Sequence, residues 1–255
     1  MLHMLNQALA QPQGCPLPAE APVEYWRALA ATPNGQAFAP PVRGTIYGAL
    51  LNHRDSLAAL GDQVHAAPYK APPRSPILYI KPRNTITGHR VPVVVPADVN
   101  EVEIGATLGV VIGRTACRVS EPDALHHVAG YTVVNDISVP HDSLYRPSMR
   151  FKCRDGFCPI GPAVIARALV GDPDALTISV AIDGVTVHRS RTSALVRSTA
   201  RLIADVTEFM TLHAGDVLMV GVAAGAPRAR AGQLVTITID GVGQLDTPLV
   251  AQEQP

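Results

Sequence analysis

Two carboxylates stand two residues apart at the start of an apolar run, in the stretch VNEVEIGATLGVVIGR at residues 99–114. Residues i and i+2 of a β-strand point to the same face, so Glu101 and Glu103 could offer a pair of ligands to one cation. Hard cations such as Mg²⁺ prefer carboxylate oxygens. The alternative is two solvated charges that precede a core strand, and the residue types alone leave both interpretations open.

A second group of polar side chains lies between apolar runs, within residues 135–161. Its members are Asn135, Asp136, His141, Asp142, Tyr145, Arg146, Lys152, Arg154 and Asp155. Cations beside carboxylates at strand ends suit the binding of a multiply charged acid, because Lys and Arg pair with its carboxylates. A loop with surface ion pairs explains the same composition equally well.

The elements that must position these residues are mainly strands. Apolar or alternating runs predict strands at 44–52, Ile77–Lys81, 91–96, 107–114, 130–136, 216–222, 233–245 and 247–250, with prolines marking 91–96 as an edge strand. Residues 176–190 predict a hairpin that turns at Asp183-Gly184, and Asp240-Gly241 predicts a second turn.

Helices are expected at fewer places in the chain. A helical turn should follow the first strand, and Ser120 is a candidate N-cap for a short helix. Residues 198–216 predict an amphipathic helix, in which Leu202, Val206, Phe209 and Met210 form a core-facing stripe. The balance is mainly β with a few helices (α+β), without the βαβ alternation of a doubly wound sheet.

The composition narrows the class of protein. Of 255 residues, 47% are hydrophobic, and 21 Lys+Arg balance 21 Asp+Glu, so no net charge attracts nucleic acid or a membrane surface. No apolar run is long enough to cross a bilayer, and the start lacks the features of a signal peptide. The four cysteines show no CxxC spacing. A cytoplasmic protein with free thiols is therefore expected.

Six stretches, taken in order, resemble the fumarylacetoacetate hydrolase family. They are GTIYGALLNHR, YKAPPRSPILYIKPRNTITG, VVIGRTACRVS, HVAGYTVVNDIS, KCRDGFCPIGP and EFMTLHAGD, and the resemblance covers about residues 43–250. Within the family, YKAPP, KPRNT and KCRDGFCPIG are similar to the first half of the isomerase/decarboxylases of homoprotocatechuate (4-hydroxyphenylacetate) breakdown. Those enzymes resemble a tandem duplication of the family domain.

The resemblance implies a mixed β-sandwich roll and three segments. Residues 1–42 would be a helical and Pro-rich extension, 43–75 a small N-terminal family segment, and 76–255 the β-roll domain. It also implies one Mg²⁺ or Mn²⁺, held by a Glu-x-Glu pair and an Asp, which stabilises an enolate as a Lewis acid.

The Glu-x-Glu of the family directly precedes the strand that is Leu108–Gly113 here. The two ligand positions are therefore Gly105 and Thr107, neither of which has a carboxylate. Glu101 and Glu103 lie four residues upstream, about 13 Å along an extended strand. Such a gap is too long for them to replace the missing ligands, and Asp136 alone keeps its ligand position.

Other family positions also differ. The acid–base pair of a mobile lid falls on Ser56 and Ala59, and the GTPxG turn becomes residues 221–225, without the threonine. Lys152 falls on a family lysine that faces substrate and is the candidate catalytic group. The candidate substrate-binding residues are Lys81, Tyr145, Arg146, Arg154 and Asp155.

The resemblance predicts an enzyme subunit that takes part in decarboxylation of 5-oxopent-3-ene-1,2,5-tricarboxylate and isomerisation of 2-hydroxyhepta-2,4-diene-1,7-dioate. The expected partners are a small di- or tricarboxylate and a metal-bearing homologous subunit or a second copy. Two alternatives stay open: a stand-alone, metal-independent catalyst acting on a keto or enol diacid, and a non-catalytic protein that binds a diacid.

Overall fold

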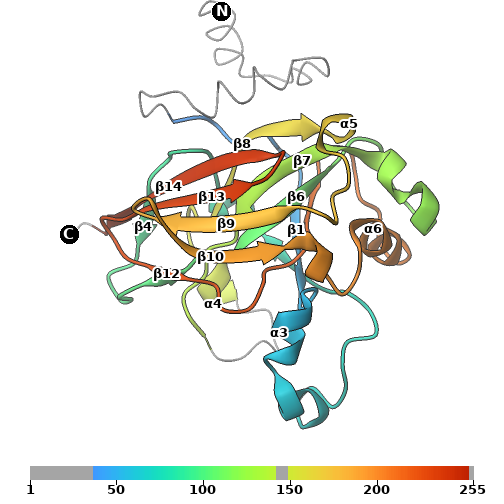
Figure 1. The fold of residues 1–255 in the computed structure, drawn as a ribbon, viewed down its shortest axis with the longest axis horizontal. Helices are drawn as coiled ribbons and strands as arrows, with labels where there is room; N and C mark the ends of the chain where they lie inside the picture. Colours follow the sequence, from blue (N-terminus) through green and yellow to red (C-terminus); the bar gives the residue numbers. More distant parts are fainter. Residues whose placement is uncertain (1–36, 142–148, 253–255) are drawn as a thin grey trace, which may run out of the picture.

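Two packed β-sheets form the body of the protein (Figure 1). The computed structural model describes residues 37–141 and 149–252. The larger sheet has the spatial order β2 (Ile77–Lys81), β1 (Ile46–Leu50), β11 (Val217–Met219), β6 (Ala106–Ile112), β7 (Val128–Asn135), β8 (Cys158–Ala166) and β3 (Ile86–Thr87). The smaller sheet has the order β10 (Val185–Arg191), β9 (Thr177–Ile182), β13 (Leu234–Ile239), β14 (Gly243–Ala251) and β4 (Val93–Val95).

Short elements surround the two sheets. A third sheet pairs β5 (Val102–Glu103) with β12 (Arg228–Ala229). The α-helices are α3 (Arg54–Ala58), α4 (Met149–Lys152), α5 (Arg167–Val170) and α6 (Thr199–Thr207), and the 3₁₀ helices are Gly61–His65, Arg83–Thr85, Glu121–His127 and Thr192–Ala194. The structure thus confirms the predicted mainly β class with few helices. No helix of the described residues is long and apolar enough to span a membrane.

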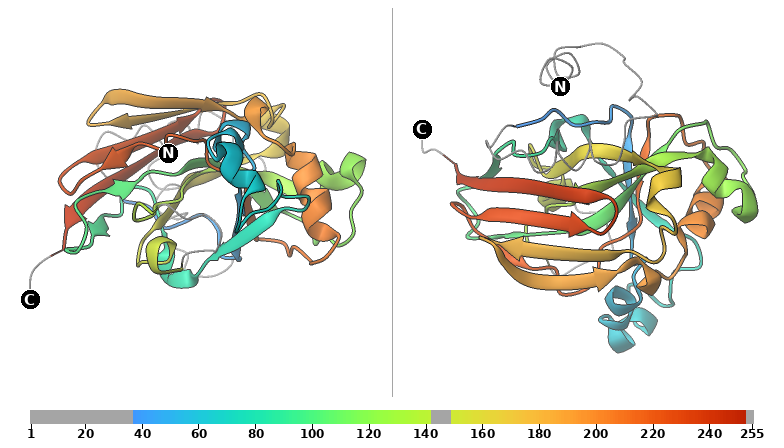
Figure 2. Two further views of the ribbon diagram at one scale, coloured as in Figure 1. Left: turned by 90° about the horizontal axis from the view of Figure 1, so that it is seen from below. Right: turned by 45° about the horizontal axis from the view of Figure 1, so that its top comes forward.

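The central strands of the larger sheet, β6, β7 and β8, are covered on both faces, which explains their continuous apolar runs. All seven residues of β6 are buried. Because alternate residues point to opposite faces, Val110 contributes to the main core against the smaller sheet and Val111 to a second cluster on the far face. β13 instead alternates between exposed or half-buried and buried residues, as expected for a strand with one face on the core. Figure 2 shows the sheets from two further directions.

Strand directions bring several strand ends to one edge of the larger sheet. β1 runs parallel to β11, whereas β11 is antiparallel to β6, and β6 is antiparallel to β7. β1, β11 and β7 therefore end at the same edge, where β6 begins. Residues that follow three strands and precede a fourth are thereby gathered in one place.

Several local predictions are confirmed. The strand Ile77–Lys81 has the predicted bounds, and β4 is an edge strand. The β9–β10 hairpin turns at Asp183 and Gly184, with φ angles of 50° and 81°. Positive φ at both central residues is what a type I′ turn requires.

Two predictions need correction. Phe209 is 61% exposed, so it does not extend the core-facing stripe of Leu202 and Val206. The cause is that α6 ends at Thr207, and the helical periodicity ends with it. After Ser120 the chain forms a 3₁₀ helix, and the Ser120 hydroxyl donates to the Asp123 carboxylate at 2.7 Å rather than capping the backbone.

The predicted N-terminal extension lies almost wholly outside the described residues, and the boundaries at 42 and 75 stay predictions. β1, from the segment 43–75, pairs with β2 on one side and β11 on the other.

Candidate functional site

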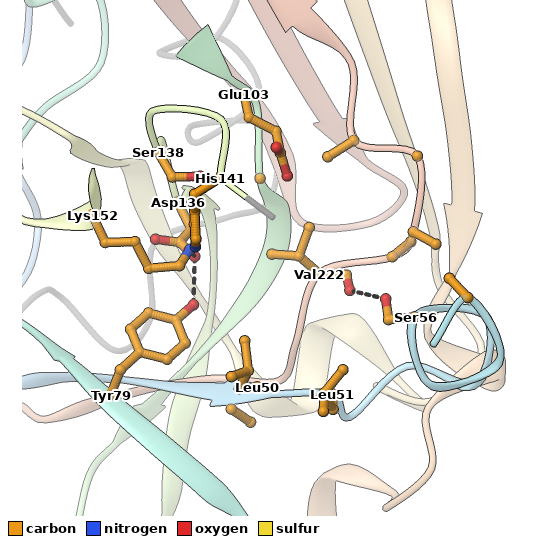
Figure 3. A pocket seen from close by; sticks show the side chains of 17 residues that line it. Leu50, Leu51, Ser56, Tyr79, Glu103, Asp136, Ser138, His141, Lys152 and Val222 are labelled. Atoms are coloured by element: carbon orange, nitrogen blue, oxygen red, sulfur yellow. Dashed lines mark hydrogen bonds and ion pairs between the residues drawn. The ribbon is translucent and has the colours of Figure 1, made fainter. Parts of the chain in front are cut away.

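A cavity of about 270 Å³ lies at the edge where β1, β7 and β11 end (Figure 3). Its lining combines polar side chains, gathered around Asp136, with apolar side chains on the remaining walls. The lining residues are Ala49, Leu50, Leu51, Ser56, Ala59, Tyr79, Glu103, Gly105, Asp136, Ser138, His141, Lys152 and residues 222–226.

The carboxylate of Asp136 is buried at one side of this cavity, directly after β7. Lys81 Nζ lies 2.7 Å from its Oδ1, and Lys152 Nζ lies 2.9 Å from its Oδ2. The Tyr79 hydroxyl also donates to Oδ2. Tyr79 and Lys81 are two residues apart on β2 and so reach Asp136 from one face of the strand. α4 supplies Lys152 from the other direction.

The charges of this cluster fix its protonation. Burial alone would raise the pKa of Asp136, but the ammonium groups of Lys152 and Lys81 outweigh burial and hold that pKa well below its usual range. Burial, followed by the negative charge of Asp136, raises the pKa of Tyr79 well above its ordinary value. At neutral pH Asp136 is therefore an ionised acceptor and Tyr79 a protonated donor.

The two lysines differ in how much hydrogen-bonding capacity their ammonium groups keep for a ligand. Lys81 is 1% exposed, and its Nζ contacts the carbonyls of Ile137 (3.1 Å) and Lys152 (2.7 Å) as well as Asp136. Two of these contacts are hydrogen bonds to carbonyls and the third is an ion pair, so all three are made inside the protein and away from the cavity lining. Lys152 Nζ hydrogen-bonds Asp136 and lies 4.9 Å from the centre of the Tyr79 ring. Among the described residues it has no second acceptor, so Lys152 keeps hydrogen-bonding capacity toward the cavity.

The residues around Asp136 do not fit the divalent cation that the family resemblance implies. Gly105 has no side chain, and a Cβ there would lie 2.4 Å from the Asp136 carbonyl oxygen. Thr107 Oγ1 is buried and donates to the Gly221 carbonyl at 2.8 Å. Asp136 Oδ2 already accepts from Tyr79 and Lys152. Oδ1 has no hydrogen-bond donor among the described residues, but the Lys81 ammonium lies 2.7 Å from it and would repel a second cation there. A hard cation needs several oxygen ligands, and this donor set does not supply them.

The side chains of Glu101 and Glu103 lie in different environments. Glu101 pairs with Arg228 (3.0 Å) and Arg230 (3.6 Å), whereas Glu103 lines the cavity beside Gly105. The expected 13 Å gap assumed one extended strand, and this assumption is wrong. The strand breaks after Glu103, and the Ala106 N–H donates to the Ile104 carbonyl at 3.2 Å, which turns the chain back toward the site.

The other sequence-predicted residues lie in different places. Arg154 pairs with Asp98 at 3.1 Å, and Asp155 accepts from Asn84 at 2.7 Å; neither lines the cavity. Asp142, Tyr145 and Arg146 lie outside the described residues. His141 lines the cavity, stacks on Phe151 and has its Nδ1 2.9 Å from the Val139 carbonyl.

The helix at the expected lid position is hydrogen-bonded to the loop across the cavity mouth. Ser56 Oγ donates to the Val222 carbonyl at 2.8 Å, and the Ala224 N–H donates to Asp55 at 3.1 Å. Asp55 also lies 2.5 Å from His53 Nδ1, and His53 is 5% exposed. His53 thus acts as a packed partner of Asp55. These contacts join α3 to residues 222–226.

Sequence reasoning missed Tyr79 as a member of the site. The available signal was its spacing from Lys81, because residues two apart on the predicted strand Ile77–Lys81 share a face. The role of Tyr79 depends on β2 lying near the end of β7. The residues around Tyr79 in the sequence do not indicate this contact between distant segments.

Comparisons with known proteins agree with this architecture. The model of the family described as "Fumarylacetoacetate (FAA) hydrolase C-terminal" matches residues 45–250. The 4-hydroxyphenylacetate degradation bifunctional isomerase/decarboxylase of Escherichia coli is 38% identical over 213 residues, which are 84% of this chain and 48% of that protein. The chain therefore spans about half the length of that relative.

Two solved structures extend the comparison. The 5-carboxymethyl-2-hydroxymuconate delta-isomerase of Mycobacterium smegmatis has a TM-score of 0.73 and 30% identity, covering 86% of this chain and 83% of that chain. The maleylpyruvate hydrolase of Sphingobium sp. SYK-6, in complex with manganese (II) ion and pyruvate, has a TM-score of 0.69 and 26% identity, covering 84% and 72%. These matches confirm the predicted type of fold.

Proposed function

The chain belongs to the fumarylacetoacetate hydrolase family, and we propose that it is a supporting subunit of an isomerase/decarboxylase in 4-hydroxyphenylacetate breakdown. In this proposal a homologous, metal-bearing subunit catalyses decarboxylation of 5-oxopent-3-ene-1,2,5-tricarboxylate and isomerisation of 2-hydroxyhepta-2,4-diene-1,7-dioate. The present chain contributes stability and subunit contacts. Its similarity to about half of the E. coli isomerase/decarboxylase supports this arrangement.

One observation carries the proposal: the Asp136 carboxylate is occupied by Lys81 and Lys152. A carboxylate that ligates a hard cation must offer at least one oxygen to it. Displacing Lys152 would leave a partly buried ammonium without its carboxylate, which is costly. Gly105 and Thr107 provide no replacement ligands. The chemistry that needs a metal is therefore assigned to the partner.

The remaining polar groups support binding rather than turnover by this chain. Ser56 donates to the loop at Val222, and Ala59 has no ionisable group, so the lid position offers no acid–base pair. Lys152 is the candidate catalytic group for the alternative, a metal-independent catalyst, because a fixed ammonium can stabilise a developing enolate charge.

A decarboxylase assay with purified subunits tests the proposal. The chain alone, a metal-bearing homologue alone and their mixture are each given the tricarboxylate with Mg²⁺, and the same three samples are assayed with EDTA. The expected result is no turnover by the chain alone and a higher rate in the mixture than with the homologue alone. Heat-denatured chain added to the homologue is the control.

Two outcomes would overturn the proposal. Turnover by the chain alone with Mg²⁺, abolished by EDTA, would mean that it carries a working metal site. Turnover by the chain alone in EDTA, abolished by Lys152→Ala, would establish the metal-independent catalyst instead.

A further inference from the structure

We propose that the cavity beside Asp136 binds a small monocarboxylate through Lys152 Nζ, without a divalent cation. This inference rests on the proposed function, since it names the ligand class for a site that does not hold the family's metal. It concerns the present chain alone and needs no partner subunit.

The cluster of Lys81, Lys152 and Asp136 carries a net charge. Two ammonium groups against one carboxylate leave a single positive charge shared by Lys81, Lys152 and Asp136. Glu103, a separate residue of the lining, carries a negative charge that is not paired with this cluster. Lys81 is buried, contacts two carbonyls and Asp136, and does not line the cavity, so the positive charge of the cluster meets the cavity at Lys152. An anion in the cavity would therefore find its complement at one atom, Lys152 Nζ.

The side chain of Lys152 is held in position before any ligand binds. Asp136 Oδ2 lies 2.9 Å from Nζ, and the Tyr79 ring lies 4.9 Å from it. An ammonium over an aromatic face is attracted by the ring. Little side-chain freedom is left to lose when a carboxylate binds, and such preorganisation favours affinity.

The rest of the lining sets the size and charge of the ligand. The wall opposite Lys152 is apolar and includes Leu50, Leu51 and Val222. A cavity of about 270 Å³ is below the usual range of about 300 to 1,000 Å³ for drug-sized ligands. The occupant should therefore be a small acid with a short carbon body.

Two side chains disfavour a second carboxylate on that ligand. Glu103 lines the same cavity, and its negative charge would repel another anion. His141 directs Nδ1 to the Val139 carbonyl at 2.9 Å, so in a neutral ring the other nitrogen is an acceptor. In the described part of the lining, Lys152 is the one Lys or Arg side chain.

Calorimetric titration of the full chain with pyruvate in EDTA tests the inference. We expect saturable binding, about tenfold or more weaker in Lys152→Met, the loss typical for a hydrogen bond to a charged group. Lys70→Met is the matched control, because Lys70 is exposed and does not line the cavity. It should bind pyruvate as the unmodified chain does, and added Mg²⁺ should not strengthen binding.

A second variant keeps the test valid if Lys152→Met does not fold. Glu103→Gln removes the repelling charge, so it should strengthen binding of succinate more than binding of pyruvate. An equal change for both acids, absence of pyruvate binding in EDTA, or binding that requires Mg²⁺ would each overturn the inference. The titrations use this chain alone, so their results do not depend on whether it raises the decarboxylase rate of a homologue. The two proposals can therefore be contradicted independently.

Discussion

Lys152 Nζ lies 2.9 Å from Asp136 Oδ2, on the cavity side of a carboxylate that is 1% exposed. A permanent cation of the chain therefore contacts the carboxylate at which the family resemblance places a metal ligand. The contact accounts for the low pKa of Asp136 together with Lys81. It also gives the site a charge that does not depend on a metal.

Replacement of Asp136 by asparagine should destabilise the fold strongly. The variant leaves the buried Lys81 ammonium without its counter-charge, and breaking a buried ion pair from one side costs about 3 to 5 kcal/mol. Urea unfolding at neutral pH measures the change. Asp98→Asn, in an exposed pair with Arg154, should leave the midpoint almost unchanged. An unaltered midpoint for Asp136→Asn would contradict a structural role for the cluster.

The same cluster predicts a pH dependence of stability. The folded-state pKa of Asp136 is depressed, so below the unfolded value of about 3.9 the unfolded chain binds a proton that the folded chain does not. The stabilisation is complete above that pH and is lost as the pH falls through and below it. Unfolding free energy measured from pH 6 downward should fall less steeply in Asp136→Asn than in the unmodified chain. Equal slopes would contradict the assignment.

The contacts of Asp55 predict local mobility of the loop across the cavity mouth. Asp55→Ala removes the acceptor for the Ala224 N–H, so hydrogen exchange in residues 222–226 should accelerate about three- to tenfold, as expected for one net hydrogen bond. Exchange measured by mass spectrometry checks this. Asp62→Ala, at an exposed position of the following 3₁₀ helix, should leave hydrogen exchange in residues 222–226 unchanged. An equal acceleration of exchange in both variants would contradict the assignment.

Cysteine reactivity offers a test of burial behind the site. Burial raises the pKa of Cys158 to about 12, whereas Cys117 is exposed. Because the thiolate is the reactive form, iodoacetamide should label Cys117 in the folded chain and Cys158 only in concentrated urea. Peptide mass spectrometry distinguishes the two. Labelling of Cys158 in the folded chain at the rate of Cys117 would mean that β8 is not buried as described.

Much of the fold could be predicted because each strand carries its own pattern. The strand Ile77–Lys81 and the turn at Asp183-Gly184 depend on neighbouring residues and are confirmed. Phe209 was predicted wrongly because helical spacing continues in the sequence beyond Thr207, while the helix does not. A periodic pattern indicates a helix more reliably than it indicates where the helix ends.

The site was less predictable because its members come from separate elements. Asp136 and Lys152 were singled out from the sequence and do meet, whereas Arg154 faces Asp98 instead of the cavity. The approach of Glu103 depends on the turn from Ile104 to Ala106, which is centred on Gly105 and which the predicted strand pattern did not include. Charged residues close in sequence can thus lie in different environments once the chain bends.

The central claim is that this chain carries a built-in cation in place of a divalent metal. Calorimetric titration of the purified chain with MgCl₂ and with MnCl₂, in the absence and presence of oxalate, tests it most directly, with a metal-bearing homologue as the positive control. The account predicts saturable binding by the homologue and none by this chain. Saturable, stoichiometric binding by this chain, abolished in Asp136→Asn, would contradict the account and would direct attention to Glu103 as a second ligand.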